Sequence, residues 1–203
     1  MKIICIGRNY ASHAKELNNA VPSQPVIFCK PDTALLDGNA PFYYPTFTND
    51  LHYELELVLK INKQGKNIAE KFAHRYYNQL TVGIDFTARD LQDQLKQKGL
   101  PWERAKGFDN SAVVGQFVEL GSVKQPHNIE FQLHKNKQLV QHGYSADMLF
   151  SFDKIIAEIS SFITLRTGDL IFTGTPAGVG AVAIGDILVG TLEGNELLNF
   201  EIK

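Results

Sequence analysis

Cysteine is scarce in this chain, with only Cys5 and Cys29 among 203 residues. The two stand beside apolar residues and lack the CxxC spacing of redox or metal-binding pairs. A chain of this length can bury a core of its own, so it needs neither disulfides nor a structural metal to fold. We therefore predict two buried, reduced thiols, as in a reducing compartment.

Long apolar runs are absent as well. The stretch Ile3–Ile6 is too short for the hydrophobic region of a secretory signal, and no small-residue cleavage site follows it. No segment approaches the roughly 20 apolar residues that a membrane-spanning helix needs. The sequence thus predicts a soluble, cytoplasmic protein with no membrane partner.

A basic excess is also missing, since 20 Lys and Arg face 22 Asp and Glu. With no surplus of positive charge to neutralise phosphates, nucleic acid is not an expected partner. The GxSxG and HExxH signatures of serine-type and zinc hydrolases do not occur. Repeats, low-complexity tracts and Pro/Gly/Ser-rich linkers are lacking too, which predicts a single domain over residues 1–203.

What the chain does contain is many short β-forming segments. Strands are predicted over residues 3–6, 51–61 and 81–86, in a hairpin over 129–141 that turns near Lys135-Asn136, and in short pieces from Asp169 to the end. The segment 21–48 holds most of the prolines and should be strand and loop.

A few helices complete the pattern, which predicts an α+β protein that is mainly β. Helices are predicted over residues 10–17, 88–98 and 152–162. Asn9 and Ser151 are candidate N-caps, and Thr87 with Asp90 forms a candidate capping box. Gly99 is the expected C′ residue that ends the second helix.

The strand over 51–61 carries two acidic residues on one face. Because side chains alternate along a strand, Glu54 and Glu56 point the same way and lie about 7 Å apart. Such a pair of hard oxygen ligands suits Mg²⁺, Mn²⁺ or Ca²⁺ better than zinc. A solvated polar face of a half-buried strand explains the same pattern, so the pair alone indicates little.

Asp85 strengthens the metal hypothesis. It ends an apolar strand immediately before a capped helix, where a side chain is rigidly placed yet reachable. The alternative is a carboxylate that interacts with the helix dipole.

Three further features are candidates for chemistry. His13 and Glu16 lie three residues apart on a predicted helix, so the carboxylate can orient the imidazole as a general base; an ordinary surface pair is the alternative. The glycine-rich loop 174–180 is either a plain turn or an anion cradle to which Thr175 adds a hydroxyl. Lys106 is either a solvated loop lysine or a positive charge for an oxyanion.

In their order along the chain, six segments resemble the fumarylacetoacetate hydrolase family, in particular its short members such as acylpyruvases and oxaloacetate decarboxylases. They are IGRNYASHAKEL (Ile6–Leu17), FCKPDTAL (Phe28–Leu35), HYELELVL (His52–Leu59), GIDFTARDLQ (Gly83–Gln92), KGLPWERAKGFD (Lys98–Asp109) and TGDLIFTGTPAGVG (Thr167–Gly180). The resemblance implies the mixed β-roll or β-sandwich of that family's C-terminal domain, with few helices, and usually a homodimer.

The resemblance also implies roles for individual residues. Glu54, Glu56 and Asp85 match the ligands of Mg²⁺ or Mn²⁺, with Ca²⁺ as a substitute in crystals. His13 and Glu16 match a dyad that activates water, on a segment that can behave as a lid. Further matches are the active-site lysine, Lys106, and the substrate contacts Arg8, Lys30, Arg89, Gln92 and Thr175.

A small 2-oxo acid is the substrate that these roles imply, bound to the metal and passing through an enolate. Because the dyad is intact, we favour hydrolysis of a C–C bond in an acylpyruvate of the fumarylpyruvate or acetylpyruvate type. The first alternative is decarboxylation or keto–enol tautomerisation of oxaloacetate, which needs the metal but depends less on the dyad. The second alternative is the reaction of a 2-oxo-dienoate hydratase or isomerase. A non-enzymatic metal-binding protein is the least favoured hypothesis.

Overall fold

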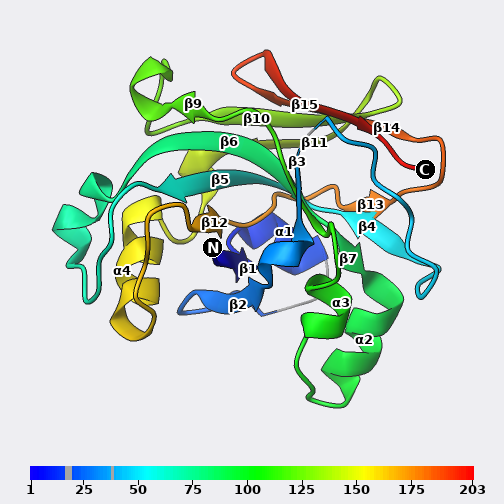
Figure 1. The fold of residues 1–203 in the computed structure, drawn as a ribbon, viewed down its shortest axis with the longest axis horizontal. Helices are drawn as coiled ribbons and strands as arrows, with labels where there is room; N and C mark the ends of the chain where they lie inside the picture. Colours follow the sequence, from blue (N-terminus) through cyan, green and yellow to red (C-terminus); the bar gives the residue numbers. More distant parts are fainter. Residues whose placement is uncertain (17–19, 38) are drawn as a thin grey trace.

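A large mixed β-sheet forms the centre of the molecule (Figure 1). The computed structural model describes residues 1–16, 20–37 and 39–203. The strand order is β2-β1-β12-β5-β6-β8-β3, with β9 beside β6; β1 runs parallel to β12 and β3 to β8. Its strands are β1 (Ile3–Gly7), β2 (Val26–Lys30), β3 (Leu35–Asp37), β5 (Leu55–Ile61), β6 (Tyr77–Asp85), β8 (Ala112–Val114), β9 (Val118–Glu119) and β12 (Leu170–Phe172).

A second, four-stranded antiparallel sheet packs along β5 and β6 (Figure 1). Its order is β11-β10-β14-β15, with bounds β10 (Glu130–Lys135), β11 (Gln138–Tyr144), β14 (Ile187–Leu192) and β15 (Asn195–Glu201). A small third sheet contains β13 (Gly180–Ala181), β4 (Leu51–Tyr53) and β7 (Thr87–Ala88). Apolar side chains of β5, β6, β10 and β14 form the main core between the first two sheets.

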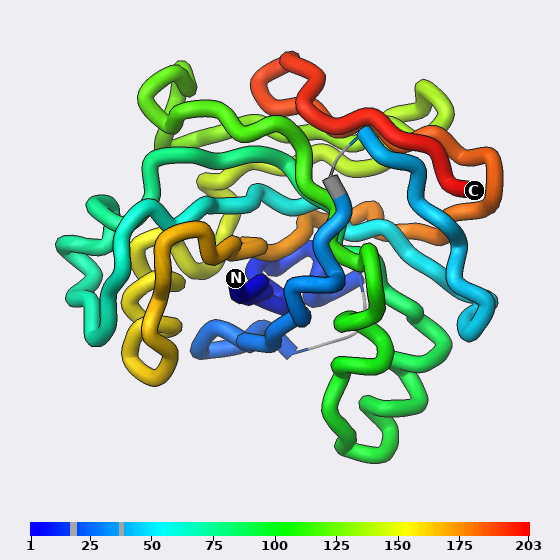
Figure 2. Tube along the Cα trace, in the orientation of Figure 1, coloured from blue at the N-terminus to red at the C-terminus, as the bar shows by residue number. Residues whose placement is uncertain are grey.

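Helices are few and lie around the sheets, so the predicted mainly-β α+β fold is confirmed (Figure 2). The helices are α1 (Ala11–Glu16), α2 (Arg89–Gln97), α3 (Glu103–Lys106) and α4 (Phe152–Phe162), with short 3₁₀ turns η1 (Asp32–Ala34), η2 (Glu70–Arg75), η3 (Leu120–Ser122) and η4 (Ser145–Asp147). Among the described residues, none of these helices has the length and apolar character to cross a membrane.

Several local predictions are confirmed. Ser151 caps α4 by accepting the backbone N–H of Lys154 at 3.2 Å. Gly99, at φ 63°, ends α2 in a Schellman motif, with the N–H of Leu100 donating to the carbonyl of Leu95. The β10–β11 hairpin turns at residues 136–137, where both φ angles are positive as in a type I′ turn.

Two predicted helix caps are wrong, because distant partners use the side chains. Asn9 does not cap α1; its amide donates to the carbonyls of Phe150 and Thr173 at 3.0 and 2.8 Å. The capping box is not formed either, since Ala88 occupies the N-cap position of α2. The Asp90 carboxylate instead accepts a hydrogen bond from Thr48 at 2.6 Å.

Other predictions need correction. The predicted strand 51–61 is two strands in different sheets, β4 and β5, which are separated at Glu54. Cys5 is buried as expected, but Cys29 is exposed on the edge strand β2. Leu17, the predicted end of the first helix, lies outside the described residues.

Gly83 on β6 leads to a stability prediction. A Cβ atom there would lie 2.7 Å from the carbonyl oxygen of Val113 and 2.8 Å from Val58. The Val113 backbone is paired in the sheet and cannot move aside. We expect Gly83→Ala to lower the free energy of unfolding by about 1–3 kcal/mol, measured by urea denaturation.

Gly121→Ala is the matched control, because no described residue other than the chain neighbours of Gly121 has an atom within 4 Å of a Cβ atom at that position. Its effect should stay within about 0.5 kcal/mol. Equal unfolding midpoints for the two variants would contradict the close packing around Gly83.

Candidate metal and active site

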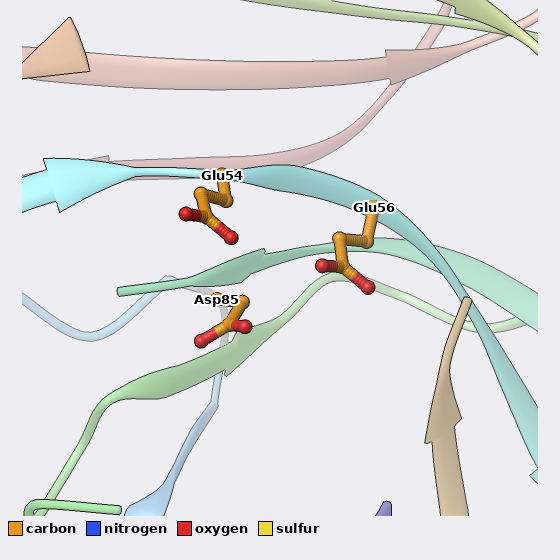
Figure 3. Close-up of side chains that lie close together, drawn as sticks. All are labelled: Glu54, Glu56 and Asp85. Carbon is orange, nitrogen blue, oxygen red and sulfur yellow. The ribbon is translucent and has the colours of Figure 1, made fainter. Parts of the chain in front are cut away.

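Three buried carboxylates lie close together at the junction between β4 and β5, beside the end of β6. Glu54 stands between the two strands, Glu56 lies in β5 and Asp85 is the last residue of β6. The N–H of Asp85 donates to the carbonyl of Glu54 at 2.8 Å, which fixes the two backbones together. One oxygen from each carboxylate lies within 4.8 Å of the others (Figure 3). Their exposed fractions are 6%, 2% and 0%, so a solvated polar face is excluded.

Two of the three carboxylates are neutralised by cationic side chains. Lys106 is buried and places its Nζ 2.8 Å from both Glu54 Oε2 and Asp85 Oδ2. Arg89 donates to Glu54 Oε1 at 2.6 Å, and Lys30 lies 2.7 Å from Asp85 Oδ1. Burial opposes ionisation of Glu54, but the charges of Lys106 and Arg89 outweigh it and hold the pKa of Glu54 well below its usual range.

Glu56 is the exception. Among the residues that the structure describes, its carboxylate receives a hydrogen bond from the N–H of Gly174, at 2.7 Å, and forms no ion pair. Burial and the charges of Asp85 and Glu54 raise its pKa well above the usual range. An added cation would relieve this repulsion.

The triad fits a divalent metal ion. All three donors are hard carboxylate oxygens, which suit Mg²⁺ or Mn²⁺. Glu54, Glu56 and Asp85 would hold the ion, and the under-compensated carboxylate of Glu56 is the observation on which this fit rests. The ammonium of Lys106 would then have to withdraw from one or both of its carboxylate partners.

A pocket opens over the triad and brings most of the predicted site residues together. Besides the three carboxylates, the predicted residues in its wall are Arg8, His13, Arg89, Gln92, Lys106 and Thr175. Arg89 Nη1 donates to Gln92 at 2.7 Å, while Arg89 Nε is buried and has no hydrogen-bond partner in the described part of the chain. That Nε is a buried donor without a partner, on a residue that lines the pocket.

Two predicted site residues do not line this pocket. Lys30 lies behind Asp85, where its ammonium also donates to the carbonyl of Lys106 and to the carbonyl and hydroxyl of Ser111. Glu16 lies behind His13: its Oε2 is 3.3 Å from His13 Nδ1. Both residues thus support a pocket residue and do not reach the pocket themselves.

The glycine-rich loop binds carboxylates, but they belong to the protein. Gly174, at φ 106°, donates its N–H to Glu56, and Gly178 donates its N–H to Glu16 at 3.0 Å. The hydroxyl of Thr175 accepts a hydrogen bond from Gln141 at 2.8 Å and borders the pocket. The loop is therefore an internal anion cradle that connects the triad to the His13–Glu16 pair.

Sequence reasoning missed several residues of the pocket wall. They are Ile6, Gly7, Phe28, Lys96 and Trp102. The ring of Trp102, the one tryptophan in the chain, lies edge-on to Phe28 at 5.8 Å. Lys96 resembled any solvated helix lysine. Nothing in the sequence around Lys96 indicates that the end of α2 reaches the pocket.

Comparisons with known proteins show the family of the chain. Residues 2–200 match the family described as fumarylacetoacetate (FAA) hydrolase C-terminal. The chain is 41% identical over 201 residues to the mitochondrial oxaloacetate tautomerase FAHD1 of Bos taurus, covering 99% of this chain and 91% of that protein. It is 42% identical over 188 residues to the mitochondrial oxaloacetate decarboxylase of Dictyostelium discoideum, covering 92% and 86%.

A solved structure extends the similarity to three dimensions. Fumarylpyruvate hydrolase from Pseudomonas aeruginosa, in complex with Mn²⁺ and pyruvate, superposes with a TM-score of 0.94 at 35% identity. The match covers 100% of this chain and 89% of that one. The predicted family fold is therefore confirmed.

Glu54 pairs with cationic side chains, whereas Glu56 forms no ion pair among the described residues. This difference predicts that matched substitutions at the two positions change the stability in opposite directions. In metal-free protein at pH 7, Glu56→Gln should raise the free energy of unfolding, because it removes a charge that burial and two neighbouring carboxylates disfavour. Glu54→Gln should lower it, by about 3 kcal/mol, because Lys106 and Arg89 lose a partner. Urea denaturation in EDTA measures both.

The pH dependence has a definite sign. A raised pKa means that Glu56 favours folding at low pH and that this contribution is lost as the pH rises through its folded-state pKa. The advantage of Glu56→Gln over wild type should therefore grow from pH 5 to pH 8. A Glu56→Gln variant less stable than wild type at pH 8 without metal would contradict this electrostatic picture.

Proposed function

Since the chain belongs to the fumarylacetoacetate hydrolase family, we propose that it catalyses divalent-metal-dependent enolate chemistry on oxaloacetate. The favoured reaction is keto–enol tautomerisation, with decarboxylation of the same substrate as its companion. The observation that carries this choice is the identity of about 40% to oxaloacetate tautomerases and a decarboxylase over almost the whole chain. It supports the oxaloacetate alternative better than the acylpyruvate hydrolysis that the sequence favoured.

The pocket supports binding of a 2-oxo acid. Arg89 and Gln92, which are hydrogen-bonded to each other in its wall, would bind the carboxylate next to the keto group. A divalent ion bound by the triad would polarise the keto oxygen and stabilise negative charge on it. Lys106 adds a buried positive charge beside the same carboxylates. These positive groups favour the enolate over the neutral ketone.

His13 supports the proton transfer. Tautomerisation moves a proton from C3 of oxaloacetate to the oxygen on C2, and imidazole can take up and release a proton near neutral pH. The carboxylate of Glu16 accepts a hydrogen bond from the N–H of Gly178 and contacts Nδ1 of His13. His13 itself lines the pocket. Tautomerisation thus draws on the dyad more than the sequence suggested.

Hydrolysis of an acylpyruvate is the second candidate. The same dyad could direct water at a second carbonyl, and the similar Pseudomonas structure is a fumarylpyruvate hydrolase. Acetylpyruvate distinguishes the two candidates, because its cleavage requires water whereas its enolisation does not. The homodimer and the cytoplasmic location stay predictions.

The proposal is tested with oxaloacetate and the purified protein. The ultraviolet absorbance of the enol follows tautomerisation, and a coupled pyruvate assay follows decarboxylation. We expect Mg²⁺ or Mn²⁺ to accelerate the approach to keto–enol equilibrium and EDTA to remove this acceleration. An unchanged rate of equilibration with metal-loaded protein would reject the proposal.

His13→Ala should separate the two oxaloacetate reactions. Removing a positioned proton carrier lowers a rate typically by about 10²–10⁴-fold, so tautomerisation should fall by that factor. Decarboxylation breaks the bond from C3 to its carboxylate and needs no proton abstracted from C3, so it should fall much less. His134→Ala, on β10 outside the pocket, is the control. Equal losses of both activities would contradict the role given to His13.

A further inference from the structure

Two cations in the pocket wall have no partner from the triad. Arg8 follows β1, and Lys96 lies in the last turn of α2; both are half-buried and line the same pocket as Glu54, Glu56 and Asp85. Within residues 1–16, 20–37 and 39–203, neither forms an ion pair or a hydrogen bond through its side chain.

The remaining cations of the site differ from these two. Lys30, Lys106 and Arg89 each contact a triad carboxylate at 2.6–2.8 Å. Their charge is therefore balanced by the protein, whereas the charge of Arg8 and Lys96 is not. An unpaired, half-buried positive charge facing a pocket is suited to an anionic ligand.

We infer that Arg8 and Lys96 form a cationic subsite that binds the second carboxylate of a dicarboxylic 2-oxo acid. The inference rests on the proposed function and deepens it: the triad end of the pocket takes the 2-oxo acid group, and this subsite takes the other end. Substrates with an uncharged tail would lack this contact, so the subsite selects dicarboxylates.

The electrostatics of Lys96 agree with this role. Partial burial and the positive charges of Arg89 and Arg8 lower the pKa of Lys96, and the charges of Asp93 and Glu54 offset this only in part. The ammonium is thus held among like charges. A bound carboxylate would relieve the repulsion and gain a charge-assisted hydrogen bond.

The backbone holds Arg8 in place at a conformational cost. Arg8 has φ 61°, in the left-handed region that a non-glycine residue rarely adopts. The next residue, Asn9, fixes this turn through hydrogen bonds of its side chain to the backbone of Phe150 and Thr173. The strained turn brings a charged side chain to the pocket wall.

Trp102 connects the two halves of the subsite. The Lys96 ammonium lies 5.9 Å from the centre of the Trp102 ring, within cation–π distance. The same ring lies 3.8 Å from the position that a Cβ atom on Gly7, the neighbour of Arg8, would occupy. Trp102 thus packs against the Arg8 turn and under the Lys96 side chain.

Binding of two inert ligands tests the subsite without turnover. Malate has the carbon skeleton of oxaloacetate, while 2-hydroxybutanoate has a methyl group in place of the second carboxylate, and neither has a keto group. We expect the Mn²⁺-loaded wild-type protein to bind malate at least about tenfold more tightly than 2-hydroxybutanoate by calorimetry. In Lys96→Met this ratio should fall severalfold, with the affinity for 2-hydroxybutanoate unchanged. Arg8→Met should behave in the same way.

Two further variants are controls. Lys96→Arg keeps the charge and should keep the preference for malate. Lys98→Met removes an exposed lysine that lies outside this pocket and should also keep it. A wild-type ratio near one, or an equal loss in Lys98→Met and Lys96→Met, would overturn the subsite.

The outcome separates the subsite from the proposed function. If oxaloacetate is not enolised but the preference for malate still depends on Lys96, the reaction is wrong and the subsite stands. If oxaloacetate is enolised and the malate ratio is the same in wild type and Lys96→Met, the subsite alone is wrong.

Discussion

The repulsion among three buried carboxylates is the constraint on which the rest of the site depends. One carboxylate oxygen each of Glu54, Glu56 and Asp85 lies within 4.8 Å of the others, and the three side chains are almost fully shielded from water. Such a group is unstable unless positive charge surrounds it. Lys106 and its neighbours supply that charge to two of the three carboxylates and leave Glu56 under-compensated. An additional cation beside Glu56 would therefore be stabilised by these carboxylates.

One loop joins the carboxylate triad to the His13–Glu16 pair. The backbone N–H of Gly174 holds Glu56, and four residues later that of Gly178 holds Glu16, which supports His13. A shift of this loop would therefore disturb the carboxylate triad and the His13–Glu16 pair together. The close approach of Gly174 to Asn9, where a Cβ atom would lie 2.6 Å from the Asn9 Cβ, also ties the loop to the Arg8 turn.

The site indicates an enolate intermediate more clearly than it indicates which bond of the substrate is broken. A triad that stabilises an enolate can serve tautomerisation, decarboxylation or hydrolysis, and the similar proteins carry names of all three kinds. In the proposed site, these reactions would differ in what His13 protonates or activates and in which group of the substrate lies beside Arg8 and Lys96. The cationic side chains of Arg8 and Lys96 in the pocket wall favour a substrate with two carboxylates.

The sequence by itself determined the features that depend on neighbours along the chain. Helix ends at Ser151 and Gly99 follow from caps within a few residues, so these were predictable. The strand pattern suggested the three carboxylates as metal ligands and the resemblance of ordered motifs strengthened that prediction, since no local pattern distinguishes a buried Glu54 from a solvated one.

Only the tertiary structure decided what the same side chains contact. Asn9 binds Phe150 and Thr173 instead of capping its helix, because those carbonyls lie more than 140 residues away in sequence but adjacent in space. For the same reason Lys30 supports Asp85 from behind, and Lys96 reaches the pocket wall. Hydrogen bonds and charges act over a few ångströms, and the spacing of residues in sequence carries no record of which distant segments the fold brings that close.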